Sequence, residues 1–412
     1  MTASTSSPTS PELQPNQRDL WILRVYYLAW IGGAGFIAPF LNLNFTREGL
    51  NGTQIGVLLS IGAVIALISA PLWSQLTERF KRPVSLLQLS MILTGLLTLA
   101  LGQVHLFQWL VVIYALRVLA SAGAGPVSDA LTVRIIEKLD VGFGSVRVWG
   151  SIGYTGIVLV SGWLIQRVGF QASFWGYLLS FIGAALLLAA LRTGPAPAQS
   201  LARRPLSLFV LPEAVMRSPG LIGLGLMVAI TGLSNTGVAQ FETVYLDQLG
   251  APESLIGVAS MIGALVEIPG MFWADRLVRR GRPERLILVA LGINLTLRTL
   301  VFLFPSVAMI ILTRALSGIS FSFITVAMIR FVSNQTSGSE TAAALAIFAV
   351  TLPNLINIAS TPLAGLAFDR FGPGWLYLIA LVGYLLAGVI FDGSLRRGRK
   401  QTAQREIAQK NP

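Results

Sequence analysis

The sequence contains no cysteine and only one histidine among its 412 residues. The absence of cysteine excludes disulfides, thiolate nucleophiles and cysteine-ligated metal sites. His105 is expected in a short external turn, and a lone histidine gives little support to a metal or catalytic role. The patterns G-x-x-x-x-G-K-[ST], G-x-S-x-G and H-E-x-x-H are absent too. Neither ATP-driven transport nor an enzyme is indicated, and we expect no cofactor and no bound metal.

Charged residues are also scarce. They make up 12% of the chain, about half of the roughly 25% that is usual in soluble domains. Hydrophobic residues make up 54%, and the mean hydropathy is +0.71. This composition excludes a disordered chain and an ordinary soluble enzyme, and it indicates a polytopic membrane protein embedded in a lipid bilayer.

Apolar runs recur along the whole chain and predict an all-α membrane protein with twelve transmembrane helices. The expected spans are 20–44, 53–76, 84–104, 107–135, 144–166, 170–191, 220–247, 254–274, 284–304, 307–331, 341–367 and 373–391. Five prolines punctuate the break between the sixth and seventh spans. We therefore divide the chain into a disordered polar tail (1–18), a six-helix half (19–192), a central loop (193–218), a second six-helix half (219–392) and a basic tail (393–412).

The positions of lysine and arginine predict the orientation. If the N-terminus lies inside and the spans alternate, the inside segments hold 22 basic residues and the outside turns hold 3. This asymmetry obeys the positive-inside rule and predicts cytoplasmic N- and C-termini in a plasma (inner) membrane. The net charge of +12 is then a topology signal on the cytoplasmic face, and it implies no nucleic-acid partner.

The two halves repeat each other in sequence. The segment SQLTER ending at Arg79 corresponds to FWADR ending at Arg276, 197 residues later. GWLIQRVG (162–169) corresponds to GLAFDRFG (365–372), and Arg117 and Arg314 are also 197 residues apart. A period near 200 predicts two pseudo-symmetric halves, a pattern typical of secondary transporters.

Charged side chains inside the spans are the candidate functional residues, because each costs about 2.5–3.5 kcal/mol to insert into the bilayer. They are Arg24, Arg117, Asp129, Arg147, Glu242, Glu267, Arg298 and Arg314. Asp129 and Arg147 flank one cytoplasmic turn, and at about 1.5 Å per residue both lie about 12–15 Å from it. We expect them either to pair with each other or to share a polar ligand. Because five basic groups face three acidic ones, the cavity slightly favours an anionic solute.

Three side chains of the second half are candidates for proton coupling or for a structural ion pair. Glu242 and Arg314 are each eight residues from an outer turn, so they share a depth, and a structural pair is the favoured interpretation. Glu267 lies in mid-membrane just before Pro269, and it is our first choice for a proton-coupling or substrate-binding acid.

Uncharged polar and aromatic groups add to the candidate site. Asn354 and Asn357 are three residues apart on one helix face. They either line the cavity or form hydrogen bonds between helices. Tyr154 follows Arg147 by seven residues and could stack on a ligand held there.

The double six-helix plan, with the turns SQLTERFKRP and FWADRLVRRGRP, resembles the major facilitator superfamily over residues 19–392. The resemblance implies gating loops at Glu78, Arg79, Asp275 and Arg276. The first copy of the loop motif departs from the family pattern, with Ser74, Glu78 and Lys81 at motif positions.

A narrower resemblance joins GPVSD (125–129) and FGSVRVWGSIGY (143–154) to the lactose permease group, which includes the nucleoside–proton symporters and phenylpropionate permease-like proteins. It implies that Asp129, Arg147 and Tyr154 bind substrate. It also implies that Glu267 binds substrate or couples its transport to protons. It also implies that Glu242 and Arg314 pair and that Arg298 assists proton transfer. Ser317 and Ser320 replace the family's His and Glu, which puts the central proton carrier in question.

Together these features predict a secondary active transporter that works by alternating access, as a functional monomer. It is expected to take up a small polar or anionic solute, such as a saccharide, nucleoside or aromatic acid, by proton symport. An antiporter or exporter of the same fold, or a non-transporting membrane receptor, remains the alternative.

Overall fold

The computed structural model describes residues 17–80, 82–137, 139, 141–191, 215–216 and 218–410. The expected N-terminal tail up to residue 16 and nearly all of the central loop lie outside these residues. Within them the chain is built from helices, with twelve spans long and apolar enough to cross a membrane. The predicted all-α, twelve-helix fold is confirmed.

The amino-terminal half contains the first six spans. Its helices are α1 (Gln17–Gly33), η1 (Ala34–Phe36), α2 (Leu41–Arg47), α3 (Gly52–Phe80), α4 (Pro83–Leu101), α5 (Phe107–Ser121), α6 (Ala124–Glu137), α7 (Gly144–Val168) and α8 (Phe170–Ala189). Two predicted spans are broken: the first consists of α1, η1 and α2, and the fourth of α5 and α6. The first break lies beside Pro39, which lacks a backbone N–H for the helical ladder.

The carboxy-terminal half contains the other six spans. Its helices are α10 (Pro219–Gln248), α11 (Glu253–Arg280), α12 (Pro283–Leu303), α13 (Val307–Ser333), α14 (Ser339–Ala346), the π-helix η2 (Ile347–Thr351), α15 (Leu352–Phe371) and α16 (Pro373–Lys410). The π-helical turn comes just before Pro353, where the ladder must accommodate a residue that donates no hydrogen bond.

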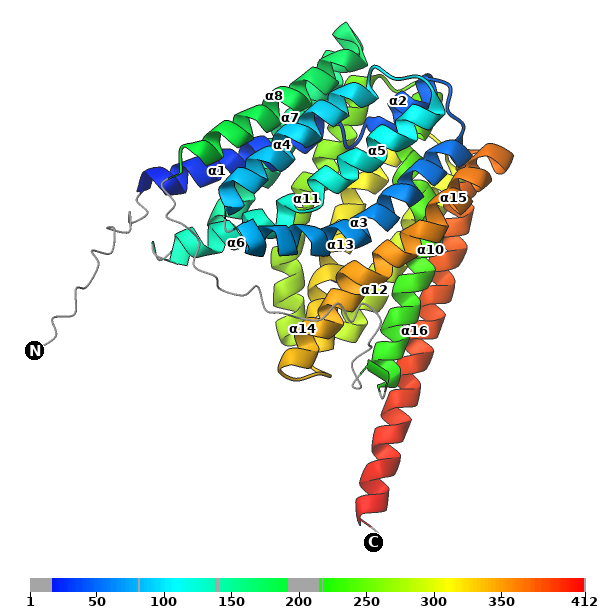
Figure 1. Cartoon of the computed structure of the whole chain (residues 1–412). Coiled ribbons are helices and arrows are strands. Elements are labelled where there is room, and N and C mark those ends of the chain that lie inside the picture. Colours follow the sequence, from blue (N-terminus) through cyan, green and yellow to red (C-terminus); the bar gives the residue numbers. More distant parts are fainter. Residues whose placement is uncertain are drawn as a thin grey trace, which may run out of the picture.

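The last helix is longer than the sequence predicted. The apolar run ends near residue 391, but α16 continues to Lys410, through most of the segment assigned to a basic tail. The extension is rich in Arg, Gln, Ala and Lys, which favour helix. An ion pair of 2.7 Å between Arg396 and Asp392, four residues apart, supports its first turn. Figure 1 shows this helix projecting beyond the bundle.

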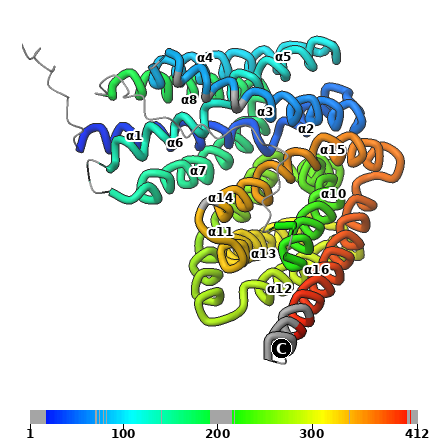
Figure 2. Tube along the Cα trace, turned by 60° about the horizontal axis from the view of Figure 1, so that its bottom comes forward, coloured from blue at the N-terminus to red at the C-terminus, as the bar shows by residue number. Residues whose placement is uncertain are grey.

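The two halves are separate bundles that meet along two seams. Helix α3 packs against α15, and α7 packs against α11. We call the end of the bundle that carries the connections 48–51, 249–252 and residue 372 the closed end, and the opposite end the far end. Hydrogen bonds between the halves gather toward the closed end, and the helices of the two halves diverge toward the far end (Figures 1 and 2).

Glycine permits the close approach of the α3–α15 seam. A Cβ added to Gly52 would lie 2.7 Å from the carbonyl oxygen of Gly365, and one added to Gly56 would lie 2.3 Å from that of Thr361. The Asp369 carboxylate of α15 accepts hydrogen bonds from the backbone N–H groups of Gly52 and Thr53, at 2.6 and 2.7 Å. The first turn of α3 is thus capped by a residue of the other half.

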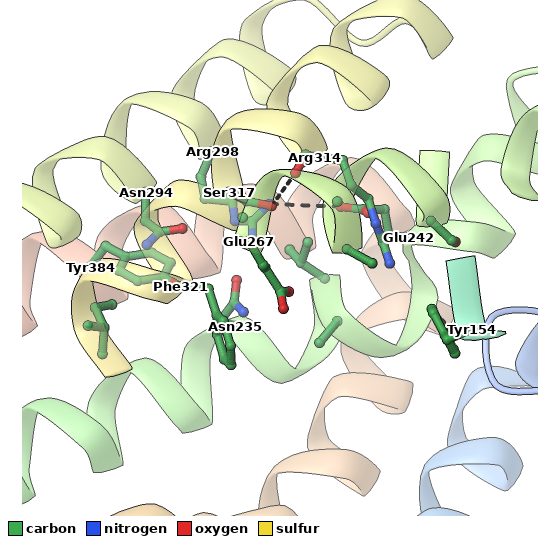
Figure 3. A pocket seen from close by; sticks show the side chains of 17 residues that line it. Tyr154, Asn235, Glu242, Glu267, Asn294, Arg298, Arg314, Ser317, Phe321 and Tyr384 are labelled. Atoms are coloured by element: carbon green, nitrogen blue, oxygen red, sulfur yellow. Dashed lines mark hydrogen bonds and ion pairs between the residues drawn. The ribbon is translucent and has the colours of Figure 1, made fainter. Parts of the chain in front are cut away.

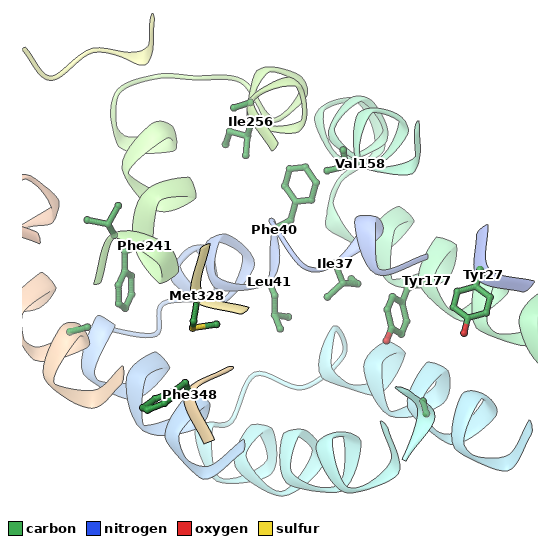
Figure 4. Close-up of a cluster of buried hydrophobic side chains, with 14 of the residues drawn as sticks. Tyr27, Ile37, Phe40, Leu41, Val158, Tyr177, Phe241, Ile256, Met328 and Phe348 are labelled. Carbon is green, nitrogen blue, oxygen red and sulfur yellow. The ribbon is translucent and has the colours of Figure 1, made fainter. Parts of the chain in front are cut away.

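The break in the first span also fills the core between the halves. Phe40 is 1% exposed, and Figure 4 shows it pointing toward Val158 of α7 and Ile256 of α11, which are both fully buried. Arg47, at the end of α2, forms ion pairs of 2.5 and 2.6 Å with Asp247 and Glu253 of the other half. Apolar packing inside and ion pairs at the rim therefore hold the closed end together.

Candidate functional site

A cavity of about 410 Å³ opens inside the carboxy-terminal half. Helices α10, α11, α12, α13 and α16 supply most of its wall, and Tyr154 of α7 is the contribution from the other half. Its polar lining consists of Tyr154, Asn235, Glu242, Ser260, Glu267, Asn294, Arg298, Arg314, Ser317 and Tyr384 (Figure 3). Five predicted site residues therefore share one cavity: Tyr154, Glu242, Glu267, Arg298 and Arg314.

Glu242 is the centre of a buried charge cluster. Its side chain is 7% exposed and forms ion pairs with Arg314 and, at 3.8 Å, with Arg298. The hydroxyl of Tyr377 donates a hydrogen bond of 3.1 Å to the same carboxylate. The pair expected from the matched depths of Glu242 and Arg314 is therefore formed. One carboxylate is shared by two arginines, so both cations have an acidic partner.

Glu267 differs from Glu242 in its surroundings. It lines the same cavity and is partly exposed, and within the described residues its carboxylate forms no hydrogen bond or ion pair. Its backbone is fixed by close packing: the carbonyl of Glu267 accepts a hydrogen bond of 2.9 Å from Ser322 of α13. The acid is thus held in place while its carboxylate stays available to a ligand or a proton.

Three other atoms of the lining are buried without a partner in the described structure. They are the Asn235 amide oxygen, the Ser260 hydroxyl and the Arg298 Nε. Buried polar atoms are normally hydrogen-bonded, and exceptions concentrate where a ligand or water completes the site.

Asp129 and Arg147 do not form the direct pair, which was one of the two expected arrangements beside a shared polar ligand. The hydroxyl of Tyr27 in α1 donates a hydrogen bond of 2.7 Å to Asp129, and the Arg147 guanidinium carbon lies 5.9 Å from the centre of the Tyr27 ring. No ion pair joins Asp129 and Arg147 in the described part of the chain. The reason is that α1 packs against both α6 and α7, and Tyr27 contacts both charges.

The remaining predicted residues lie elsewhere. Asn354 of α15 donates to the carbonyl of Val350 in the adjoining η2 at 2.9 Å, and neither it nor Asn357 lines the cavity. In the expected gating loops, Arg79 and Arg276 are exposed. Asp275 accepts a hydrogen bond of 2.9 Å from Arg279. Glu78 belongs to α3, and its side chain lies outside the described residues.

Two tyrosines of the charge networks were not predicted. Tyr27 binds Asp129 and Tyr377 binds Glu242, and both are almost fully buried. The repeat carried a hint of the second, because Tyr377 lies 200 residues after Tyr177. Across the described residues, no group of three or more acidic, histidine or cysteine side chains is placed to hold a metal ion.

Comparison with known proteins identifies the family. Residues 20–379 match the MFS_1 like family. The chain belongs to this family of major facilitator transporters. It is 25% identical over 370 residues to the uncharacterized transporter YwbF of Bacillus subtilis (strain 168), with 89% of this chain and 90% of that protein covered. It is 24% identical over 380 residues to the maltose permease of Geobacillus stearothermophilus, with 89% and 93% covered.

The fold comparison agrees with the family. The crystal structure of the nucleoside transporter NupG superposes with a TM-score of 0.77 at 14% identity, over 92% of this chain and 99% of that one. The MFS_1-like chain is therefore a multi-pass membrane transporter of small molecules, and the predicted major facilitator fold is confirmed.

Proposed function

We propose that this transporter takes up a small polar solute across the plasma membrane by proton-coupled symport, as a functional monomer. The relatives named for maltose and nucleoside transport support a saccharide or nucleoside. An aromatic acid is the third candidate from the sequence resemblance. The solute occupies the cavity beside Tyr154, and Asp129 and Arg147 complete its site from the amino-terminal half when the halves close around it.

The orientation follows from the distribution of basic residues. With 22 of them in the inside segments and 3 in the outside turns, both termini and the far end are cytoplasmic. The closed end then faces the outside, and the contacts between α3 and α15 and between α7 and α11 describe an inward-facing conformation. Transport requires these seams to open while the far end closes.

The unpaired Glu267 carboxylate carries the proposal of proton coupling. Glu242 forms ion pairs with both arginines of the cavity, whereas the Glu267 carboxylate has no ion-pair partner within the described residues. Glu267 is therefore the acid free to exchange a proton as its surroundings change. A buried group that gains or loses a proton with access to one side of the membrane links that proton to the conformational cycle. Arg298 and the Glu242–Arg314 pair determine the electrostatic field around the Glu267 carboxylate.

The decisive experiment measures transport in proteoliposomes with an imposed pH gradient, inside alkaline. Radiolabelled maltose, uridine and 3-phenylpropionate serve as the probes. The protein is expected to accumulate one of them, and Glu267→Gln is expected to abolish accumulation while it spares exchange down a concentration gradient. Glu284→Gln is the matched control, because Glu284 pairs with Arg399 outside the cavity at 3.4 Å. It is expected to transport normally.

Other results would point to the alternatives. Accumulation only when the gradient is reversed would indicate an antiporter or exporter. No flux or exchange of any probe would favour a non-transporting receptor. Normal accumulation by Glu267→Gln would remove Glu267 from the coupling role but leave transport itself intact.

A further inference from the structure

Ser260 is an unusual helical serine. It is 4% exposed and lines the cavity, and its hydroxyl has no partner within the described residues. Many other helical hydroxyls of this protein donate to the carbonyl four residues earlier, as Ser69, Ser234 and Thr236 do. Thr94 and Thr132 also lack a partner in the described structure, but neither lines the cavity. A buried hydroxyl without that internal bond is unfavourable unless another group completes it, and the adjoining space is the cavity.

Asn235 presents a second buried oxygen without a partner. It lies 13 residues before the end of α10, and Glu267 lies 14 residues after the start of α11. At about 1.5 Å per residue, both are therefore about 20 Å from the closed end. Figure 3 shows the two side chains projecting into the same part of the cavity. An amide oxygen and a carboxylate at one depth both require hydrogen-bond donors.

Ser260 extends this polar surface along the cavity. It precedes Glu267 by seven residues on α11, which places both on one face about 10 Å apart. Asn235 and Glu242 have the same seven-residue spacing on α10. A solute that bridges Ser260 and the Asn235–Glu267 level must therefore carry polar groups at separated positions.

The charges of the lining do not favour an anion. Arg298 and Arg314 are balanced by Glu242 and Glu267, and Glu242 already contacts both arginines. An anionic solute would meet the unpaired Glu267 carboxylate, which repels it. A simple ammonium would satisfy Glu267 but could not accept a hydrogen bond from the unpartnered Arg298 Nε.

Hydroxyl groups satisfy every unpartnered atom of the cavity, because each hydroxyl both donates and accepts. We infer that the transported solute is a neutral molecule with several hydroxyl groups, selected by hydrogen bonds from those hydroxyls to Asn235 and Glu267 and by an exchange of hydrogen bonds with Ser260. This inference rests on the proposed function, and it replaces the slight preference for an anion drawn from the arginine count.

The test is a comparison of substrates and variants in the same proteoliposomes. Maltose and uridine are the hydroxylated neutral probes, 3-phenylpropionate is the anion and tyramine is the ammonium. The parent is expected to transport a neutral probe and neither ion. Loss of one neutral hydrogen bond is expected to raise KM by about two- to tenfold in Asn235→Leu and in Ser260→Ala. Ser260→Thr keeps the hydroxyl and is expected to restore KM.

Thermal unfolding in detergent separates recognition from a structural role. Because neither oxygen has a partner among the residues that the structure describes, Asn235→Leu and Ser260→Ala are expected to leave the midpoint unchanged or raise it. Ser333→Ala is the matched control, since Ser333 is exposed and its hydroxyl donates to the Ile329 carbonyl of its own helix. It should change neither KM nor the midpoint.

Each contrary outcome is distinguishable. Transport of 3-phenylpropionate or tyramine alone would overturn the inference and leave the proposed transport function standing. Transport of a neutral probe with an unchanged KM in Asn235→Leu and Ser260→Ala would overturn the role of these residues. No transport of any probe by the parent protein would overturn both the inference and the proposed function.

Discussion

The two halves of this transporter repeat one framework but differ in their charge. Thr98 and Arg298 are 200 residues apart, as are Tyr177 and Tyr377. In the amino-terminal half, Arg117 donates a hydrogen bond of 2.9 Å to Thr98 and lies 5.9 Å from the centre of the Tyr177 ring. In the carboxy-terminal half, Arg298 lies 5.7 Å from the centre of the Tyr377 ring and shares Glu242 with Arg314.

The two copies differ because only the carboxy-terminal one places a carboxylate beside its arginine. No ion pair in the described residues links Arg117 to an acid, so its charge is met by a hydroxyl and aromatic rings. The equivalent Arg314 has Glu242, and the cavity with the free Glu267 opens beside that cluster. Arg117 thus packs against a hydroxyl and aromatic rings in the amino-terminal copy, whereas the equivalent Arg314 belongs to the ionisable lining of the cavity in the carboxy-terminal copy.

Glu242→Gln is expected to have the largest effect on stability. It leaves Arg298 and Arg314 with no carboxylate partner in the cluster, and breaking a buried ion pair typically costs about 3–5 kcal/mol. Thermal unfolding in detergent, followed by tryptophan fluorescence, should show a large fall in the midpoint. Removing one of the two unmatched cations in Glu242→Gln/Arg314→Gln should recover part of it. A midpoint unchanged from the parent would mean that the cluster does not support the carboxy-terminal half.

Arg117→Met tests the other copy and is expected to cost less. The variant loses one hydrogen bond from a charged group, worth about 1.5–3 kcal/mol, but it leaves no orphaned carboxylate. Thr98 keeps its hydrogen bond of 2.6 Å to the Thr94 carbonyl. Unfolding midpoints of Arg117→Met and Glu242→Gln, measured side by side, give the comparison. Equal losses would show that the two copies are energetically alike despite their different charges.

The sequence predicted the fold and one of the two charge pairs. Hydropathy and the repeat near 200 residues were sufficient for twelve spans in two halves. Glu242 and Arg314 were expected at one depth, and they meet. For Asp129 and Arg147 the same argument left a direct pair and a shared ligand open. The direct pair is not formed, because equal depth does not specify the direction in which a side chain points around its helix. There Tyr27 contacts both charges instead.

The unpredicted parts of the site depend on tertiary structure. Ser260 was not proposed, because a serine within an apolar span normally bonds to its own helix and only the folded chain reveals that this one does not. Tyr377 carries no charge, so no insertion cost drew attention to it. The end of α16 was missed because a polar helix that continues beyond the bilayer leaves no hydropathy signal.

The two seams between the halves also differ by a carboxylate at repeated positions. Asp369 of the carboxy-terminal half caps α3, whereas the repeated position in the amino-terminal half is the neutral, exposed Gln166. Asp369→Asn removes a negative charge from a helix N-terminus, worth about 0.3–2 kcal/mol, and should favour opening of the closed end.

The absence of native cysteine makes this shift measurable. A Ser60→Cys probe lies in the α3–α15 seam, where Ser60 bonds to the Ile358 carbonyl. Its labelling by an impermeant maleimide should rise by about two- to thirtyfold in the Asp369→Asn background. Gln166→Asn is the matched control and should leave the rate unchanged. If Asp369→Asn labels at the parent rate, the carboxylate does not hold the seam closed.

Asn354→Ala is expected to have the smallest effect, and it defines how far the binding surface of the carboxy-terminal half extends. The Asn354 amide donates to the Val350 carbonyl of the adjoining η2 and lies outside the cavity lining. We expect the unfolding free energy to change by no more than about 0.5 kcal/mol, as for surface substitutions. Uptake of the transported probe should be unchanged within error. A clear rise in KM would place α15 in the substrate site, which is one of the two roles that the sequence left open for Asn354, and would mean that the binding surface changes between conformations.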